Sequence, residues 1–226
     1  MHERFVDVKE AIPSIQLDIR YHSSHNFVGE RIVGYGAPRC LLTKEAASAL
    51  AKVQEELRAL SLSLKMYDCY RPQRAVDHFV RWADNINDIR TKEEFYPTVE
   101  KRNLFREAYI DAKSGHSRGS TVDVTAVPLP VPRQASYRPG EKLYACYLPA
   151  EKRFKDNSID MGTGFDCFHE LSHTANKRIG KQQQNNRQLL KKVMEKYGFN
   201  NYEKEWWHFT LRDEPFPNAY FDFVIE

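Results

Sequence analysis

Residues 43–72 read TKEAASALAKVQEELRALSLSLKMYDCYRP, and in this stretch a helix pattern runs directly into a strand pattern. Thr43 is a good N-cap. Behind it the apolar residues recur at steps of three and four, the spacing of an amphipathic helix, at Ala46, Leu50, Val53, Leu57 and Leu60. From residue 62 apolar and polar residues alternate, which is the period of a half-buried strand. We therefore expect a helix over 43–60 and a strand that ends at Arg71.

Further elements are indicated on the C-terminal side of this stretch. Pro72 suits the first turn of a second helix, whose apolar face would consist of Val76, Phe79, Val80 and Ala83. Over residues 121–125 valines alternate with polar residues. A short strand there would hold Asp123 on the face opposite the valines, so this face is expected to be polar or to carry a site.

The last third of the chain predicts one more helix and two strands. The helix would be formed by Leu189, Leu190, Val193, Met194 and Tyr197 and would end at Gly198. Strands are expected at 205–211 and 219–225, and loops at the proline-rich segment 128–139 and at 181–186. The sequence thus predicts one α+β domain over residues 1–226, with a central antiparallel sheet flanked by helices.

Composition and charge exclude several classes of partner. The 226 residues contain 34 Lys and Arg against 31 Asp and Glu, a net charge of +3 that favours neither nucleic acid nor an anionic membrane surface. No stretch reaches the roughly 18 apolar residues of a membrane span. The opening Met1-His2-Glu3-Arg4 leads into no signal-peptide core, so we expect a cytoplasmic protein, or a periplasmic one if a signal was removed.

Four cysteines, at positions 40, 69, 146 and 167, form no C-x-x-C pair and so predict neither a zinc knuckle nor a redox motif. We interpret them as small buried packing residues. Two disulfides in an oxidising compartment are the alternative, and the sequence does not choose among the three possible pairings.

Two segments carry residue types that bind metals. Ser114-Gly-His-Ser-Arg-Gly-Ser-Thr-Val-Asp123 offers His116 and Asp123 from a turn and a following strand, which can direct an imidazole and a carboxylate to one point. Taken alone, this pair is also explained as unrelated surface or capping residues. The second segment, Glu205-Trp206-Trp207-His208, offers a third ligand in His208.

Three protein ligands would leave a fourth position open for water, which is the coordination of a hydrolytic zinc, and Glu205 would accept the proton of that water. An aromatic core strand with a hydrogen-bonded histidine is the alternative. Residues three apart in a strand point to opposite faces, so Glu205 is expected to precede the strand or to lie in a bend.

The segment His169-Glu170-Leu171-Ser172-His173 is a literal H-E-x-x-H and competes as a zinc site. Its flanks are poor in helix formers, and no third ligand follows at the expected spacing. We therefore interpret it as a polar loop or short helix.

Together the motifs closely resemble the D-alanyl-D-alanine dipeptidases of the vancomycin-resistance type, zinc enzymes related to the peptidoglycan D,D-carboxypeptidases. The resemblance runs in family order from about residue 18 to the C-terminus. It rests on DIRY at 18–21, NFVG at 26–29, YRP at 70–72, the run ending at Asp123, DMGT at 160–163, EWWH at 205–208 and YFDF at 220–223.

The resemblance implies one zinc ion per chain on one sheet face, held by His116, Asp123 and His208. It also implies that Glu205 is the general base and then acid, and that Arg71 is directed at the scissile carbonyl. A dipeptide substrate needs a small pocket that pairs both of its charged ends. Asp160 is the candidate for the ammonium group, and Ser114, Tyr21 and Tyr35 are candidates for positioning the polar ends of the substrate.

Two alternatives remain open. A D,D- or L,D-carboxypeptidase would apply the same chemistry to larger peptidoglycan peptides, and a zinc-binding module without turnover would keep only the ligands. The presence of Glu205 and Arg71 beside the three ligands argues against the module. The physiological role, cell-wall precursor metabolism or glycopeptide resistance, and the oligomeric state are not indicated by the sequence.

Overall fold

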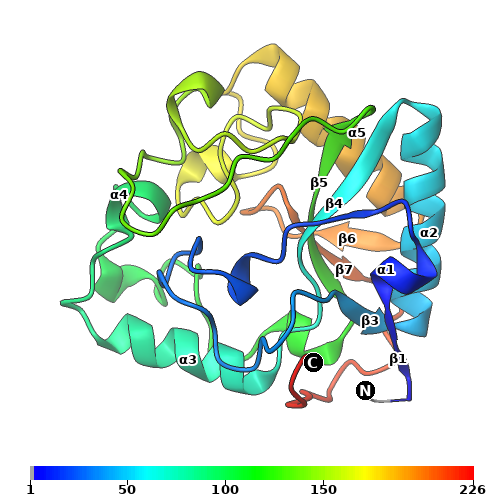
Figure 1. Cartoon of the computed structure of the whole chain (residues 1–226), viewed down its shortest axis with the longest axis horizontal. Coiled ribbons are helices and arrows are strands. Elements are labelled where there is room, and N and C mark those ends of the chain that lie inside the picture. Colours follow the sequence, from blue (N-terminus) through cyan, green and yellow to red (C-terminus); the bar gives the residue numbers. More distant parts are fainter. Residues whose placement is uncertain (1–2) are drawn as a thin grey trace.

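The main sheet has five strands in the order β2-β4-β5-β7-β6 (Figure 1). A computed structural model describes residues 3–226, so the first two residues of the predicted domain lie outside the described part. The strands are β2 (Gln16–Leu17), β4 (Leu62–Asp68), β5 (Thr121–Pro128), β6 (Phe199–Asn201) and β7 (His208–Leu211).

The predicted α+β class is confirmed, but the sheet is mixed and not wholly antiparallel. β4, β5, β7 and β6 pair in antiparallel fashion, whereas β2 runs parallel to β4 at the edge. The reason is the long connection between β2 and β4, which contains helix α2 (Lys44–Ala59). A parallel pair requires such a crossover, and the two-residue β2 gave no alternation by which the sequence could reveal it.

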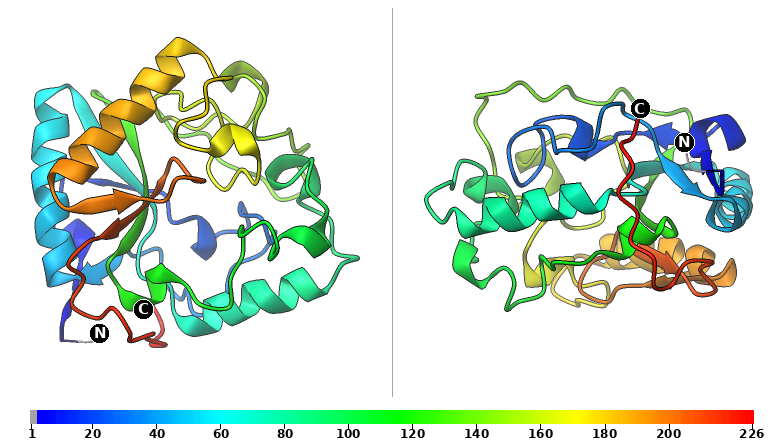
Figure 2. Two further views of the ribbon diagram at one scale, coloured as in Figure 1. Left: turned by 180° about the vertical axis from the view of Figure 1, so that it is seen from behind. Right: turned by 90° about the horizontal axis from the view of Figure 1, so that it is seen from below.

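The other elements surround this sheet. A separate two-stranded antiparallel sheet pairs β1 (Phe5–Asp7) with β3 (Leu41–Thr43). The remaining helices are α1 (Val8–Ala11), α3 (Gln73–Asp84), α4 (Lys92–Phe95) and α5 (Lys181–Lys196). Single 3-10 turns are η1 (Arg20–His22), η2 (Lys101–Asn103), η3 (Gly115–Arg118), η4 (Ala150–Lys152) and η5 (Glu170–Ser172). α2 and α5 pack together beside the sheet, and α3 lies apart from them (Figures 1 and 2).

The helix and strand predicted from residues 43–72 are confirmed, although the strand ends at Asp68 and not at Arg71. The hydroxyl of Thr43 caps α2 by accepting a hydrogen bond from the amide of Ala46, and Leu50, Val53 and Leu57 are fully buried. β4 follows directly, but it is buried on both faces and not only on one. The reason is a set of buried charges on its second face.

Lys65 is the centre of this charged set. Its side chain is 2% exposed, and its ammonium lies 2.6 Å from the carboxylate of Asp156. Asp156 also pairs with Arg20 at 2.8 Å and accepts a hydrogen bond from the hydroxyl of Tyr67. Burial lowers the pKa of Lys65, and the carboxylate of Asp156 opposes this effect.

Two sequence expectations in the last third of the chain are wrong. Residues 181–186, expected as a loop, form the first turns of α5, because their polar side chains occupy the exposed face of a helix that buries Leu190, Val193 and Met194. Residues 219–225, expected as a strand, form only an isolated bridge between Ile225 and Tyr35. The backbone of Phe221 instead bonds to the carbonyl of Ser117 in η3 and to the amide of Gln73 at the start of α3.

The cysteines are paired and are not free packing residues, so that interpretation is wrong. One disulfide joins Cys40 to Cys69 and the other joins Cys146 to Cys167. The proline-rich segment is an internal loop as expected, and residues 129–149 contain neither helix nor strand. Within residues 3–226, no helix is long and apolar enough to cross a membrane.

We predict that Asp156→Ala lowers the free energy of unfolding by about 3 kcal/mol or more, because it removes a partner from buried charges. Urea denaturation followed by circular dichroism measures this change. The control is Glu45→Ala, which breaks an exposed pair with Arg4 and should change stability little. Equal losses in the two variants would show that the Lys65 cluster contributes no more than a surface pair.

Candidate active site

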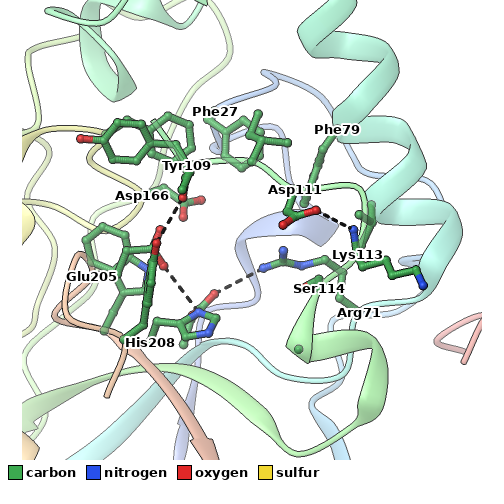
Figure 3. A pocket seen from close by; sticks show the side chains of 18 of the residues that line it. Phe27, Arg71, Phe79, Tyr109, Asp111, Lys113, Ser114, Asp166, Glu205 and His208 are labelled. Carbon is green, nitrogen blue, oxygen red and sulfur yellow. Dashed lines mark hydrogen bonds and ion pairs between the residues drawn. The ribbon is translucent and has the colours of Figure 1, made fainter. Parts of the chain in front are cut away.

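A cavity of about 440 Å³ lies where β5 and β7 meet the segments around residues 71, 110, 166 and 205 (Figure 3). Its polar lining includes Arg71, Asp123, Asp166, Glu205 and His208, and these side chains converge from separate parts of the chain. Aromatic rings complete the wall at Phe27, Phe79, Tyr109 and Phe168. An apolar wall of this kind limits the water around the polar groups and so strengthens their interactions.

The predicted metal ligands are brought together. Asp123 on β5 is the direct register partner of His208, the first residue of β7. His116 reaches the same point from η3, which the hydroxyl of Ser114 caps and which Gly119 ends in the left-handed region at φ 82°. One ligand atom from each of the three residues can be chosen so that all lie within 4.8 Å of one another.

The donor atoms of this group suit a metal ion. The Nδ1–H of His116 donates to the carbonyl of Cys69 at 2.7 Å, which leaves Nε2 with its lone pair directed at Asp123. Nδ1 of His208 lies 3.1 Å from Oδ1 of Asp123. This Oδ1 is buried and has no hydrogen-bond partner among residues 3–226. A buried acceptor that lacks a donor is the expected state of a carboxylate that ligates a metal.

Glu205 lies in the turn before β7, as the spacing argument required. Its carbonyl accepts a hydrogen bond from the amide of His208, and its carboxylate is 3.5 Å from Nδ1 of the same residue. Burial raises the pKa of Glu205 to about 7, against the opposing effect of His208. A carboxylate with such a pKa can both accept and return a proton near neutral pH.

Arg71 is fixed by a residue that the sequence argument did not identify. Its Nε donates to the fully buried Asp68 at 2.9 Å, and its guanidinium lies over the ring of Tyr21 at 4.9 Å. Asp68 also accepts a hydrogen bond from the hydroxyl of Tyr35 at 2.6 Å. Tyr35 therefore supports Arg71 through Asp68. Contrary to our expectation, its hydroxyl is not directed at the cavity.

The pKa values of the buried acids reflect how far neighbouring positive groups offset the effect of burial. Burial raises the pKa of Asp68, although Arg71 opposes it. Burial would also raise the pKa of Asp123, but His116 and His208 hold it well below its usual value. Asp123 is therefore the acid among these that is held ionised by its neighbours.

Asp166 is a second residue that the sequence argument missed. Its side chain lines the cavity and is largely buried, and it accepts a hydrogen bond from the hydroxyl of Tyr21 at 2.8 Å. Burial raises the pKa of Asp166, and the nearby charge of Asp123 raises it further. The available signal was an acidic residue between Phe165 and Phe168, only six positions after Asp160.

Asp160, the expected ammonium partner, is occupied elsewhere. Its carboxylate binds the guanidinium of Arg153 and the amide of Gln183, each at 2.7 Å, and it accepts the amide N–H of Gly162. Within residues 3–226, Asp160 is not one of the residues that line the cavity described above. Of the four expected substrate contacts, the structure thus brings Ser114 and Tyr21 to the cavity wall.

The H-E-x-x-H segment forms the short polar turn that its flanks predicted. η5 comprises only three residues, and Nδ1 of His169 accepts a hydrogen bond from the amide of Leu171. Arg187 donates to the carbonyls of Leu171 and His173, so these carbonyls are not available to a longer helix. Glu170 is exposed and pairs with Arg178.

Comparison with known proteins agrees with this site. A model of peptidase family M15, described as D-ala-D-ala dipeptidase, matches residues 1–129 and 151–226. The chain belongs to this dipeptidase family. A D-alanyl-D-alanine dipeptidase of Enterococcus faecalis is 37% identical over 225 residues, which cover both chains fully. Dipeptidases of Streptomyces coelicolor, 37% identical over 98% of each chain, and of Escherichia coli, 30% identical over 91% of this chain and 83% of the relative, are also similar.

For this member of the dipeptidase family, the geometry predicts which histidines retain metal. His116→Ala and His208→Ala should reduce the metal content after dialysis against zinc, because each removes one of three converging ligands. His169→Ala and His173→Ala should keep the parental content, measured by atomic absorption. The opposite pattern would assign the metal to the H-E-x-x-H segment.

Proposed function

We propose that this chain hydrolyses the dipeptide D-alanyl-D-alanine and that it uses one zinc ion per chain for this reaction. The observation that carries the proposal is the convergence of His116, Asp123 and His208 at the wall of a cavity that Asp123, His208, Glu205 and Arg71 line. Membership of the family and its similar dipeptidases support the substrate.

Zinc is the metal that best fits two imidazoles and one carboxylate with an open fourth position. When bound, it supplies the Lewis-acid chemistry that activates water and the scissile carbonyl. We propose His116, Asp123 and His208 as its ligands. The hydrogen bond from His116 to the carbonyl of Cys69 would fix the orientation of that ligand.

Glu205 is proposed as the group that moves the proton. Its carboxylate lies next to the ligand group and its pKa of about 7 suits both halves of the cycle. It would accept a proton from the attacking water and then donate that proton to the amine that leaves. Trp207 lines the same cavity and is buried, so it limits the water that can reach this acid.

Arg71 is proposed to stabilise the oxyanion that forms on the carbonyl carbon. Its Nη2 lies 3.5 Å from Asp123, so the guanidinium stands at the ligand group. Asp68 holds the other edge of the guanidinium, and a donor that is already oriented costs little reorganisation during the reaction.

Asp166 takes the place of Asp160 as the proposed partner of the substrate ammonium. The four largely buried carboxylates around the cavity are Asp68, Asp123, Asp166 and Glu205. Among residues 3–226, Arg71, with 12% of its side chain exposed, is the one largely buried Lys or Arg that lines it. A divalent metal and one ammonium group would together supply the three missing positive charges. A ligand that places an ammonium group next to Asp166 therefore fits this part of the cavity better than an uncharged ligand, and the carboxylate of a dipeptide would have to lie away from these acids.

The two disulfides bear on the cellular setting of this activity. Disulfides persist mainly in oxidising compartments. The two disulfides therefore weigh against the expected cytoplasmic location and favour the periplasmic alternative. Cell-wall precursor metabolism follows from the proposed substrate, whereas glycopeptide resistance stays a prediction from the resemblance.

We predict that Glu205→Gln lowers kcat by at least about a hundredfold, because a positioned general base contributes 10²–10⁴-fold. The zinc content should stay unchanged, since the three ligands are intact. Release of D-alanine from D-Ala-D-Ala measures the rate. Glu170→Gln is the matched control from the competing motif and should keep the parental rate, so an inactive Glu170→Gln with an active Glu205→Gln would contradict the proposal.

We also predict a preference for the dipeptide over a pentapeptide that ends in D-Ala-D-Ala. The amide that replaces the ammonium in the longer peptide carries no charge and would leave Asp166 buried without a counter-ion. Values of kcat/KM for both peptides measure the preference. Equal values would instead assign the chain to the D,D-carboxypeptidases, the alternative with the same chemistry.

A further inference from the structure

Residues 130–150 lie outside the part of the chain that the family model matches. This segment, here called the inserted loop, reaches the active-site wall through a covalent bond. Cys146 of the inserted loop forms a disulfide with Cys167, which stands between Asp166 and Phe168 in the sequence. Both of these neighbours line the cavity.

The disulfide joins two firmly held pieces of backbone. The amide of Cys146 donates to the carbonyl of Glu94, and its own carbonyl accepts from the amide of Gly164, at 2.9 and 2.8 Å. On the other side, the carbonyl of Cys167 accepts a hydrogen bond from Ser172 at 2.7 Å. Both cysteines are buried, so the bond links the inserted loop to the interior and not to the surface.

The position of Asp166 is unfavourable for its backbone and for its carboxylate, so it depends on support from the surrounding structure. Its backbone is in the left-handed region at φ 54°, which is uncommon for a residue with a side chain. Its carboxylate is 4% exposed and lies near Asp123, so burial and a like charge both oppose its ionised form. The hydroxyl of Tyr21 is the one side-chain donor that reaches it among residues 3–226. Without further support, rotation toward solvent would relieve these costs.

We propose that the Cys146–Cys167 disulfide is a positioning device that holds the carboxylate of Asp166 at the ammonium subsite. Cys146 and Cys167 are thus positioning residues, and they act on substrate binding through Asp166. The inference rests on the proposed function, because it takes the ammonium of the dipeptide as the ligand of Asp166. It goes beyond the family match, since the family model does not cover Cys146.

The test is a mutant cycle on the zinc-loaded full chain, with kcat and KM for D-Ala-D-Ala as readouts. Asp166→Asn alone should raise KM at least about tenfold, since it removes one partner of a buried charge pair. The double variant Cys146→Ala/Cys167→Ala should raise KM about tenfold with kcat changed less than threefold, as expected when a binding group is displaced by about an ångström. The triple variant should have the KM of Asp166→Asn within about twofold, because residues that act through one another are not additive.

The control separates positioning from simple loss of stability. Leu57→Ala removes a fully buried side chain of α2, a helix that contributes no residue to the cavity lining among residues 3–226. It should lower Tm, as the loss of a disulfide does, while KM stays at the parental value. A KM for Leu57→Ala that rises as much as that of the double cysteine variant would overturn the inference.

The remaining outcomes are also decisive. If the triple variant shows the product of the two separate increases in KM, the disulfide does not act through Asp166 and the inference is wrong. An unchanged KM in the double cysteine variant, with an active parent, would also overturn it and leave the proposed function intact. A parent that neither binds nor cleaves D-Ala-D-Ala would refute the proposed function itself, and the inference would fall with it.

Discussion

The active site is organised around an excess of buried negative charge. Asp68, Asp123, Asp166 and Glu205 are largely withdrawn from water, and Arg71, 12% exposed, is the one largely buried Lys or Arg side chain that faces them within residues 3–226. Burying an ionised acid without a partner of opposite charge is costly. An acid that lacks such a partner therefore takes up a proton. The raised pKa values of Asp68, Asp166 and Glu205 express that cost. A metal ion and a substrate ammonium would relieve it together, so the same constraint accounts for both proposed ligands.

The fold maintains this arrangement by register and by anchoring. Pairing of β5 with β7 sets Asp123 directly opposite His208, and a slip of β7 by one residue would turn His208 to the other face, away from Asp123. Asp68, at the end of β4, links Arg71 and Tyr35 and lies 3.5 Å from Nδ1 of His116. One buried carboxylate, whose own position is set by the strand, therefore orients the proposed oxyanion donor and lies next to the ligand group.

The sequence predicted those features that depend on local pattern. The stripe and cap of α2, the alternation at β5 and the turn position of Glu205 follow from spacing within short segments, whereas the metal-ligand group was implied by the resemblance to the dipeptidases. Features set by distant contacts were missed or misplaced. Asp160 and Asp166 are equally plausible as acidic residues, and only tertiary contacts show that the first binds Arg153 while the second faces the cavity. Likewise, no spacing rule reveals that Cys146 pairs with Cys167.

Anomalous X-ray diffraction at the zinc edge, from crystals of Glu205→Gln grown with D-Ala-D-Ala, tests the central claim most directly. The account predicts one strong anomalous peak per chain, within about 2.0–2.2 Å of nitrogen atoms of His116 and His208 and of an oxygen of Asp123. It also predicts the dipeptide ammonium in contact with Asp166. A peak at His169 and His173, or a dipeptide ammonium that contacts Asp160 and not Asp166, would contradict it.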